Sequence, residues 1–240
     1  RTIKLLFYLV KICLGGHKAY LTYSYKAMGI PSYYRTLITK IPHAIQRKVP
    51  TGTSTLVIDM NCMIYHVLRE PKMAAIPFPG EQGRIGWERK LQDEVCSYLT
   101  HIWRSAGAPG QVYVALDGVV PYAKIKQQRF RRFKSAALAS GSVGGSSEAK
   151  GGSPTWDTNS ITPGTQFMAS MGSSLKEAGK KHGWVISDTD EPGEGEHKVL
   201  QWLLSTKLKE GGVVVYGLDA DLILLCLIAG NKLGPKFPIY

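Results

Sequence analysis

The sequence is poor in cysteine, has no long apolar run and carries no acidic residue before position 59. Only four cysteines occur in 240 residues: Cys13, Cys62, Cys96 and Cys226. No two of them form a Cys-x-x-Cys pair, which excludes a small disulfide scaffold. The few cysteines indicate a reducing, intracellular compartment, and the sequence does not distinguish cytoplasm from nucleus. The best apolar candidate, Leu5 to Leu14, is interrupted by Lys11 and is too short to span a bilayer. We therefore expect no membrane-spanning segment.

Positive charge is abundant and unevenly distributed. The chain has 30 Lys and Arg against 18 Asp and Glu, a formal charge of +12. Nine of these cations precede the first acid, and a second basic block holds six more: Lys124, Lys126, Arg129, Arg131, Arg132 and Lys134. Clustered cations suit a nucleic acid, because neutralising phosphates releases counterions. We interpret the leading cations as a solvated face and the second block as functional.

Composition divides the chain into segments. Residues 1–27 start without a methionine and show no sustained period, so we treat them as a basic extension of unknown role, with Met28 as the natural start. The whole chain is 44% hydrophobic, enough to bury a sizeable core, and we assign residues 28–240 to one domain. Residues 136–154 are rich in Gly, Ser and Ala, which predicts a flexible surface loop.

Short apolar runs alternate with helical periodicity. Four runs are predicted strands: Thr55–Asp59, Val112–Asp117, Trp184–Ser187 and Val213–Asp219. Between them we expect helices over Trp87–Trp103, from an N-cap at Thr162 towards Gly183, and from Gly195 to about Lys209. The alternation predicts an α/β fold, with a mostly parallel central sheet flanked by helices.

Acidic residues follow the predicted strands. In a parallel sheet, ligands bind beyond the carboxyl ends of the strands, so these carboxylates are expected to converge. The candidate metal ligands are Asp59, Asp117, Glu194, Glu196, Asp219 and Asp221. One Asp alone would be a helix cap or turn residue, but several would repel one another unless cations such as Mg²⁺ or Mn²⁺ were bound. The pattern indicates a two-metal phosphodiester hydrolase, and we assign His197, at a helix start, no catalytic role.

The second basic block supplies a complementary pocket. If it is helical, four side chains share one face at i, i+4, i+7 and i+8: Lys124, Gln128, Arg131 and Arg132. A lysine, an amide and two guanidinium groups on one face suit a terminal phosphate. The alternative is an amphipathic surface helix, which we disfavour because the block directly follows Asp117.

Together these motifs resemble the XRN-type 5′-to-3′ exoribonucleases, a branch of the wider flap-endonuclease-like group. The matching segments include Met28-Gly-Ile-Pro-Ser-Tyr-Tyr, Leu56-Val-Ile-Asp-Met-Asn, the Asp117 to Lys134 block, Trp156 to Met168, Pro192 to Lys198 and Tyr216-Gly-Leu-Asp-Ala-Asp. The resemblance implies a PIN/flap-nuclease-like fold and the amino-terminal part of a catalytic domain. It also implies that the six carboxylates bind two Mg²⁺ ions.

The resemblance implies a substrate as well. The basic face would hold the 5′-monophosphate of single-stranded RNA, and Tyr65 would stack on the terminal base where the family carries a histidine. The product would be a nucleoside 5′-monophosphate. A second conserved region with a seventh metal-binding aspartate would lie beyond Tyr240, or a partner chain would complete the site. A catalytically incomplete nucleic-acid-binding or structural protein, and a flap endonuclease, are the alternatives.

Overall fold

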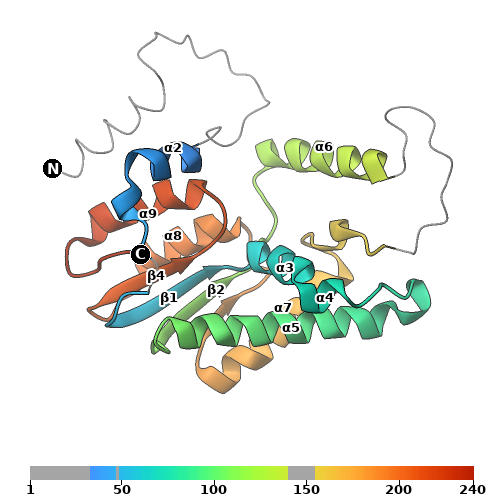
Figure 1. Ribbon diagram of the computed structural model, residues 1–240, viewed down its shortest axis with the longest axis horizontal. Helices are drawn as coiled ribbons and strands as arrows, with labels where there is room; N and C mark the ends of the chain where they lie inside the picture. The colour runs from blue at the N-terminus through green and yellow to red at the C-terminus, as the bar shows by residue number, and fades with distance from the viewer. Residues whose placement is uncertain (1–32, 47–48, 140–154) are drawn as a thin grey trace, which may run out of the picture.

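A parallel β-sheet forms the centre of the molecule (Figure 1). The structure is a computed structural model and describes residues 33–46, 49–139 and 155–240. Within this part the sheet has the order β3-β2-β1-β4, with strands β1 (Thr53–Asp59), β2 (Gln111–Ala115), β3 (Val185–Ser187) and β4 (Gly212–Tyr216). All of its strand pairs are parallel, which confirms the predicted α/β fold and is consistent with a PIN-like nuclease. The predicted extension over residues 1–27 lies outside the described residues.

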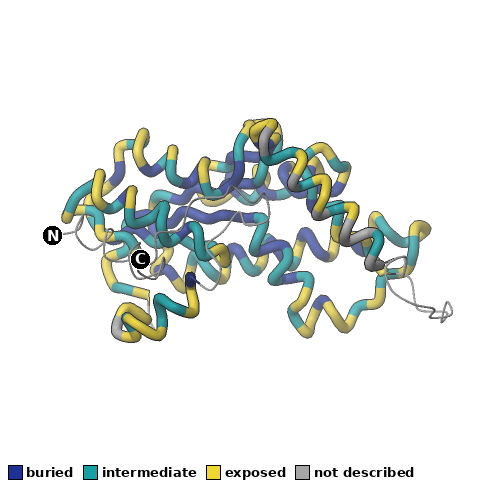
Figure 2. The backbone as a smooth tube through the Cα atoms, turned by 90° about the horizontal axis from the view of Figure 1, so that it is seen from above, coloured by how far each residue is buried: buried dark blue, intermediate teal, exposed yellow. Residues whose placement is uncertain are grey.

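The central strands β1 and β2 are largely buried on both faces, as continuous apolar runs predict, whereas the edge strands β3 and β4 are only partly buried. In β1, Leu56 and Ile58 pack into the core on one side, whereas Val57 packs on the other, and all three have no exposed surface. At the edge, the end of the chain lies beside β4, where Tyr240 donates its backbone N–H to Val213 O at 2.8 Å. Buried residues, dark blue in Figure 2, therefore run along the strands through the middle of the molecule.

Helices cover both faces of the sheet. The described α-helices are α2 (Tyr33–Lys40), α3 (Met60–Arg69), α4 (Pro71–Ala74), α5 (Arg84–Ser105), α6 (Tyr122–Ala139), α7 (Gln166–His182), α8 (Gly195–Ser205) and α9 (Asp221–Leu233). Short 3₁₀ turns lie at Pro42–Ala44, Glu81–Gly83 and Thr158–Ser160. Helices α3, α5 and α7 supply the larger core, and α8 and α9 cover the opposite face (Figure 1).

Helix α7 starts later than the sequence predicts. Its N-cap is Thr165, whose Oγ1 accepts the Met168 N–H at 3.3 Å, so the prediction of Thr162 is wrong. The reason is Gly164, whose φ of +88° lies in the left-handed region and cannot belong to a right-handed helix. Helix α8 also ends earlier than predicted, because Thr206 turns to an extended conformation directly after Ser205.

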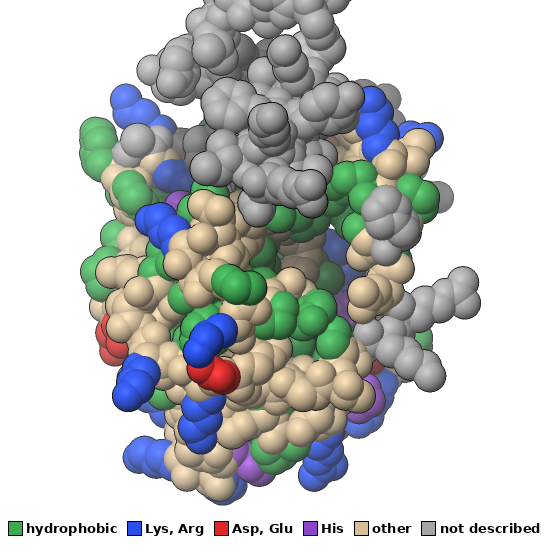
Figure 3. Space-filling model, turned by 90° about the vertical axis from the view of Figure 1, so that its left-hand side faces the viewer, with side chains coloured by type: hydrophobic (Ala, Val, Ile, Leu, Met, Phe, Trp, Pro, Cys, Tyr) green, Lys and Arg blue, Asp and Glu red, His purple; other side chains and the backbone are tan. Residues whose placement is uncertain are grey.

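The predicted Gly/Ser-rich loop overlaps a helix. Helix α6 continues through Ala139, so residues 136–139 are helical, and residues 140–154 lie outside the described part of the chain. Figure 3 views the side of Figure 1 on which α2 and α9 lie, and basic side chains predominate over acidic ones there. No described helix is both long enough and apolar enough to cross a membrane.

Candidate metal centre and phosphate pocket

Asp59 is the central side chain of the predicted site. It ends β1, is 9% exposed, and its Oδ1 is buried with no hydrogen-bond partner among the described residues. Burial, followed by the charges of Asp117 and Glu196, raises the pKa of Asp59 to about 7. Gly195 leaves the adjacent space open, because a Cβ there would lie 2.5 Å from Asp59 Oδ1. The fold thus buries a carboxylate among other carboxylates.

Asp117 lies two residues beyond β2 and is held by the backbone and an amide. Asn61 donates from Nδ2 to Asp117 Oδ2 at 3.0 Å, and the Asp117 N–H donates back to Asn61 Oδ1 at 3.0 Å. The Gly195 N–H, at the start of α8, donates to Asp117 Oδ1 at 2.7 Å. Burial raises the pKa of Asp117, and the Gly195 hydrogen bond opposes it. These contacts join α3, the segment after β2 and α8 at one point. The sequence analysis missed the role of Asn61.

The Gly-Glu-Gly-Glu-His turn brings two further carboxylates to this point. Glu194 is the N-cap residue of α8 and is buried, and Glu196 lies in the first turn. Ligand atoms of Glu194, Glu196 and His197 all lie within 4.8 Å of one another, close enough to share a metal ion. His197 Nδ1 is 3.4 Å from Glu194 Oε2, so this histidine lies beside the acidic cluster, although sequence reasoning gave it no role.

The last two predicted ligands come from the β4–α9 connection. Asp219 is exposed, yet its charge raises the pKa values of both Asp59 and Glu196, which places it beside them. Asp221 is the first residue of α9, and its N–H donates to Asp219 Oδ1 at 3.1 Å. Strand β4 ends at Tyr216, three residues before Asp219, so this aspartate lies on a loop rather than at the strand end that the sequence predicted.

Helix α6 places the predicted phosphate pocket beside the acids. Lys124 Nζ forms an ion pair with Glu194 Oε2, and Arg132 Nη2 donates to Gln128 Oε1 at 3.4 Å. Tyr65 is half-buried; burial and Asp117 raise its pKa, whereas Arg132 lowers it, so the phenol lies between the acids and α6. The side chain of Arg131 is outside the described part of the structure.

Lys198 is a supporting residue that the sequence analysis missed. It is 6% exposed, and its Nζ donates to Leu116 O at 2.9 Å and to Asp188 O at 2.7 Å. Burial lowers its pKa, while the nearby charges of Glu191 and Asp117 raise it. This lysine ties the segments after β2 and β3 to α8. Lys198 directly precedes Val199 on the apolar face of the predicted helix, and nothing in the sequence indicated this role.

Comparisons with known proteins identify the family of this chain. The family model described as the XRN 5′-3′ exonuclease N-terminus matches residues 28–233. The chain belongs to the XRN 5′-3′ exonuclease family. It is 30% identical over 239 residues to 5′-3′ exoribonuclease 1 of Saccharomyces cerevisiae, covering 88% of this chain and 15% of that protein.

Other relatives of this XRN-family chain show the same relationship. It is 33% identical to 5′-3′ exoribonuclease 1 of Homo sapiens, over 83% of this chain and 12% of that protein. It is 32% identical to 5′-3′ exoribonuclease 2 of Schizosaccharomyces pombe, over 83% of this chain and 24% of that protein. The chain therefore spans a minor part of the length of these relatives.

The acidic cluster of this XRN-family chain has the properties of a divalent-cation site. Its donors are carboxylate oxygens, which hard cations prefer, with one histidine at the edge. Within the described part of the chain, Asp59 Oδ1 is buried without a hydrogen-bond donor, and a buried polar atom normally has a partner. A bound cation would satisfy this oxygen and offset the repulsion between the acids. The residues present therefore fit a metal ion.

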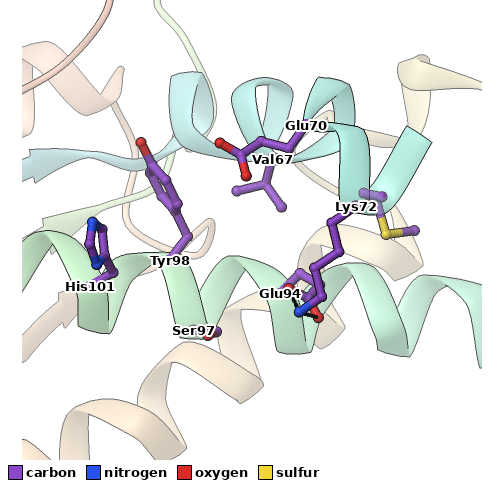
Figure 4. Close-up of a pocket in the computed structure, with 8 residues that line it drawn as sticks. Val67, Glu70, Lys72, Glu94, Ser97, Tyr98 and His101 are labelled. Atoms are coloured by element: carbon purple, nitrogen blue, oxygen red, sulfur yellow. Dashed lines mark hydrogen bonds and ion pairs between the residues drawn. The ribbon is translucent and has the colours of Figure 1, made fainter. Parts of the chain in front are cut away.

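A separate pocket of about 270 Å³ lies between the α3–α4 segment and α5 (Figure 4). Tyr98 and Glu70 point towards the same space, and Lys72 Nζ pairs with Glu94 at 2.7 Å at its edge. None of the predicted site residues whose side chains the structure describes lines it. This pocket is therefore distinct from the acidic cluster.

Proposed function

We propose that residues 28–240 form the amino-terminal part of the catalytic domain of a divalent-metal-dependent 5′-to-3′ exoribonuclease. The substrate is single-stranded RNA with a 5′-monophosphate, and the product is a nucleoside 5′-monophosphate. The observation that carries this proposal is Asp59 Oδ1, which is buried among neighbouring carboxylates and has no hydrogen-bond partner in the described ranges. Membership of the XRN family and the names of its relatives support the reaction class.

The acidic residues are proposed to hold two Mg²⁺ ions, for which Mn²⁺ can substitute. The ligands are Asp59, Asp117, Glu194, Glu196, Asp219 and Asp221. Bound divalent ions would stabilise the negative charge that develops on the scissile phosphate. Asn61 and the Gly195 N–H orient Asp117 for this task, since both donate to its carboxylate. Their hydrogen bonds fix the ligand before substrate arrives.

The inner face of α6 is proposed to recognise the 5′ end. Lys124, Gln128, Arg131 and Arg132 would hold the terminal phosphate, and Tyr65 would stack on the first base. Lys124 supports this role because its ion pair with Glu194 puts a cation at the boundary between the phosphate pocket and the acidic cluster. A pocket for one terminal phosphate selects a free 5′-monophosphate end and so gives direction to hydrolysis.

The test combines three substrates with one matched pair of variants. The substrates are 5′-phosphorylated RNA, 5′-hydroxyl RNA and a branched DNA, each with Mg²⁺ or with EDTA. Asp59→Asn removes a charge at the proposed centre, and Asp93→Asn makes the same change at an exposed position of α5. Mononucleotide release from 5′-phosphorylated RNA should fall by about 100-fold or more in Asp59→Asn and stay unchanged in the control.

Each alternative has its own outcome. Release that persists in EDTA or in Asp59→Asn contradicts the metal-dependent mechanism. RNA that binds without any mononucleotide release, in wild type with Mg²⁺, favours the nucleic-acid-binding alternative. Cleavage at DNA branch junctions regardless of the 5′ phosphate favours a flap endonuclease.

A further inference from the structure

We infer that the outer face of α6 is a second binding surface for single-stranded RNA, downstream of the 5′ end. This inference rests on the proposed function, since it concerns the path of the same RNA strand. The surface, called the outer stripe below, consists of three aromatic and two basic side chains: Tyr122, Lys126, Arg129, Phe130 and Phe133.

The outer stripe is strongly exposed. Tyr122 is 77% exposed, Phe130 71% and Phe133 68%, and the two cations are exposed as well. At 3.6 residues per turn, positions i, i+4, i+7, i+8 and i+11 fall within about 100° of arc. The described part of α6 shows exposed and intermediate residues and no buried ones in Figure 2. Three large apolar rings are thus displayed along one side of a single helix.

The opposite side of the same helix contains the proposed phosphate pocket. Lys124 pairs with Glu194, and Arg132 lies near the Tyr65 phenol, so this side faces the acidic cluster. Helix α6 lies above α3 on the side of the sheet where the strands end (Figure 1). One helix therefore separates the proposed 5′-end site from the outer stripe.

The chemistry of the outer stripe favours single-stranded RNA over an apolar protein partner. Exposed aromatic rings can stack on unpaired bases, and neighbouring cations contact the phosphates between them. Lys126 and Arg129 lie between Tyr122 and Phe130 along the helix, so the outer stripe combines cations with rings. No acidic residue occurs anywhere in α6, so nothing in its sequence repels a polyanion.

The geometry predicts dependence on RNA length. A helix with its side chains is about 10 Å across, so a strand whose 5′ end lies on the inner side must pass around α6 to reach the outer stripe. A short oligonucleotide would occupy the inner side only. A longer strand would contact both sides and bind more tightly.

The experiment measures RNA binding in the Asp59→Asn background, so that hydrolysis does not interfere. Phe130→Ala with Phe133→Ala is the test variant, and Ile85→Ala, which removes a 74% exposed side chain from α5, is the control. The probes are fluorescent 5′-phosphorylated oligouridylates of about 4 and about 20 nucleotides. Only the longer probe is long enough to reach the outer stripe from the 5′-end site. Affinity for the longer probe should fall about tenfold in the test variant and stay unchanged in the control.

A second variant tests the cations. Lys126→Ala with Arg129→Ala should reduce the slope of log affinity against log salt by about two for the longer probe. Unchanged affinity for the longer probe in the aromatic variant overturns the inference, as does an equal loss for both probes. Either result leaves the proposed function intact, because the short probe and the cleavage assay report on the inner side alone.

Discussion

The acidic cluster and helix α6 lie side by side but are built in different ways. The acids Asp59, Asp117 and Glu194 are largely buried and follow strands or start a helix, and backbone N–H groups and Asn61 fix Asp117. Helix α6 has no fully buried described residue, and its inner side chains reach the acids through Lys124. We therefore expect a rigid centre for the proposed reaction and an adaptable helix for the proposed RNA substrate.

The difference also separates two kinds of measurement. Changes at the acidic cluster should alter folding stability, because charged groups are buried there and burial of charge costs free energy. Changes on α6 should alter RNA binding and leave folding stability nearly unchanged, because its side chains are mainly solvent-facing. Three variants test this separation.

The largest expected effect is a dependence of stability on pH. The pKa of Asp59 is near 7 in the folded protein and far lower when unfolded, so its ionisation favours the unfolded state. Without metal, the folded state should therefore lose up to about 4 kcal/mol as pH rises from about 4 to about 7. Asp59→Asn should abolish most of this loss. Urea unfolding in EDTA at several pH values measures it, and parallel pH curves for both proteins would contradict it.

The next effect concerns Lys198. Replacing it with Met leaves Leu116 O and Asp188 O without their buried donor, which should lower the free energy of unfolding by about 3 kcal/mol. Lys180→Met, at an exposed position of α7, should change it by less than about 0.5 kcal/mol. Urea unfolding compares the two variants. A small loss in Lys198→Met would mean that the acidic cluster is less rigid than its contacts indicate.

The smallest change in stability is expected at Lys124. Lys124→Met should weaken binding of 5′-phosphorylated RNA by about 30-fold, because the terminal phosphate loses a charge-assisted contact. The matched change Lys90→Met on α5 should have little effect on binding. Fluorescence anisotropy gives the affinities, and thermal unfolding should stay within a few degrees of wild type. If Lys124→Met instead lowers the unfolding temperature by more than a few degrees and still binds RNA with wild-type affinity, the contrast between the two regions is wrong.

Much of the fold was predictable because it depends on local patterns. Apolar runs located all four strands of the described sheet, and the period of Trp87, Leu91 and Val95 located α5. Element ends were less predictable: Gly164 moved the start of α7, and Thr206 ended α8 early. The backbone conformation of one residue decides where such a helix begins or ends. The spacing of apolar residues does not specify that conformation.

The candidate site was predictable to the level of residue types. Five acids lie where carboxyl ends of strands and a helix start meet, and α6 presents Lys124 to them. The supporting residues Asn61 and Lys198 were not found, because their partners are 56 and 82 positions away in the chain. His197 was given no role, although its i, i+3 spacing from Glu194 at the start of α8 could have indicated their proximity.

The sequence by itself determined the alternation of strands and helices, the acids that follow the strands and the one-sided basic face of α6. Each of these is a property of neighbouring residues and their period. The tertiary structure alone decided that Asp59 Oδ1 is buried with no hydrogen-bond partner among the described residues. Desolvation and charge repulsion depend on groups from β2, α8 and the β4–α9 loop, which only folding brings together.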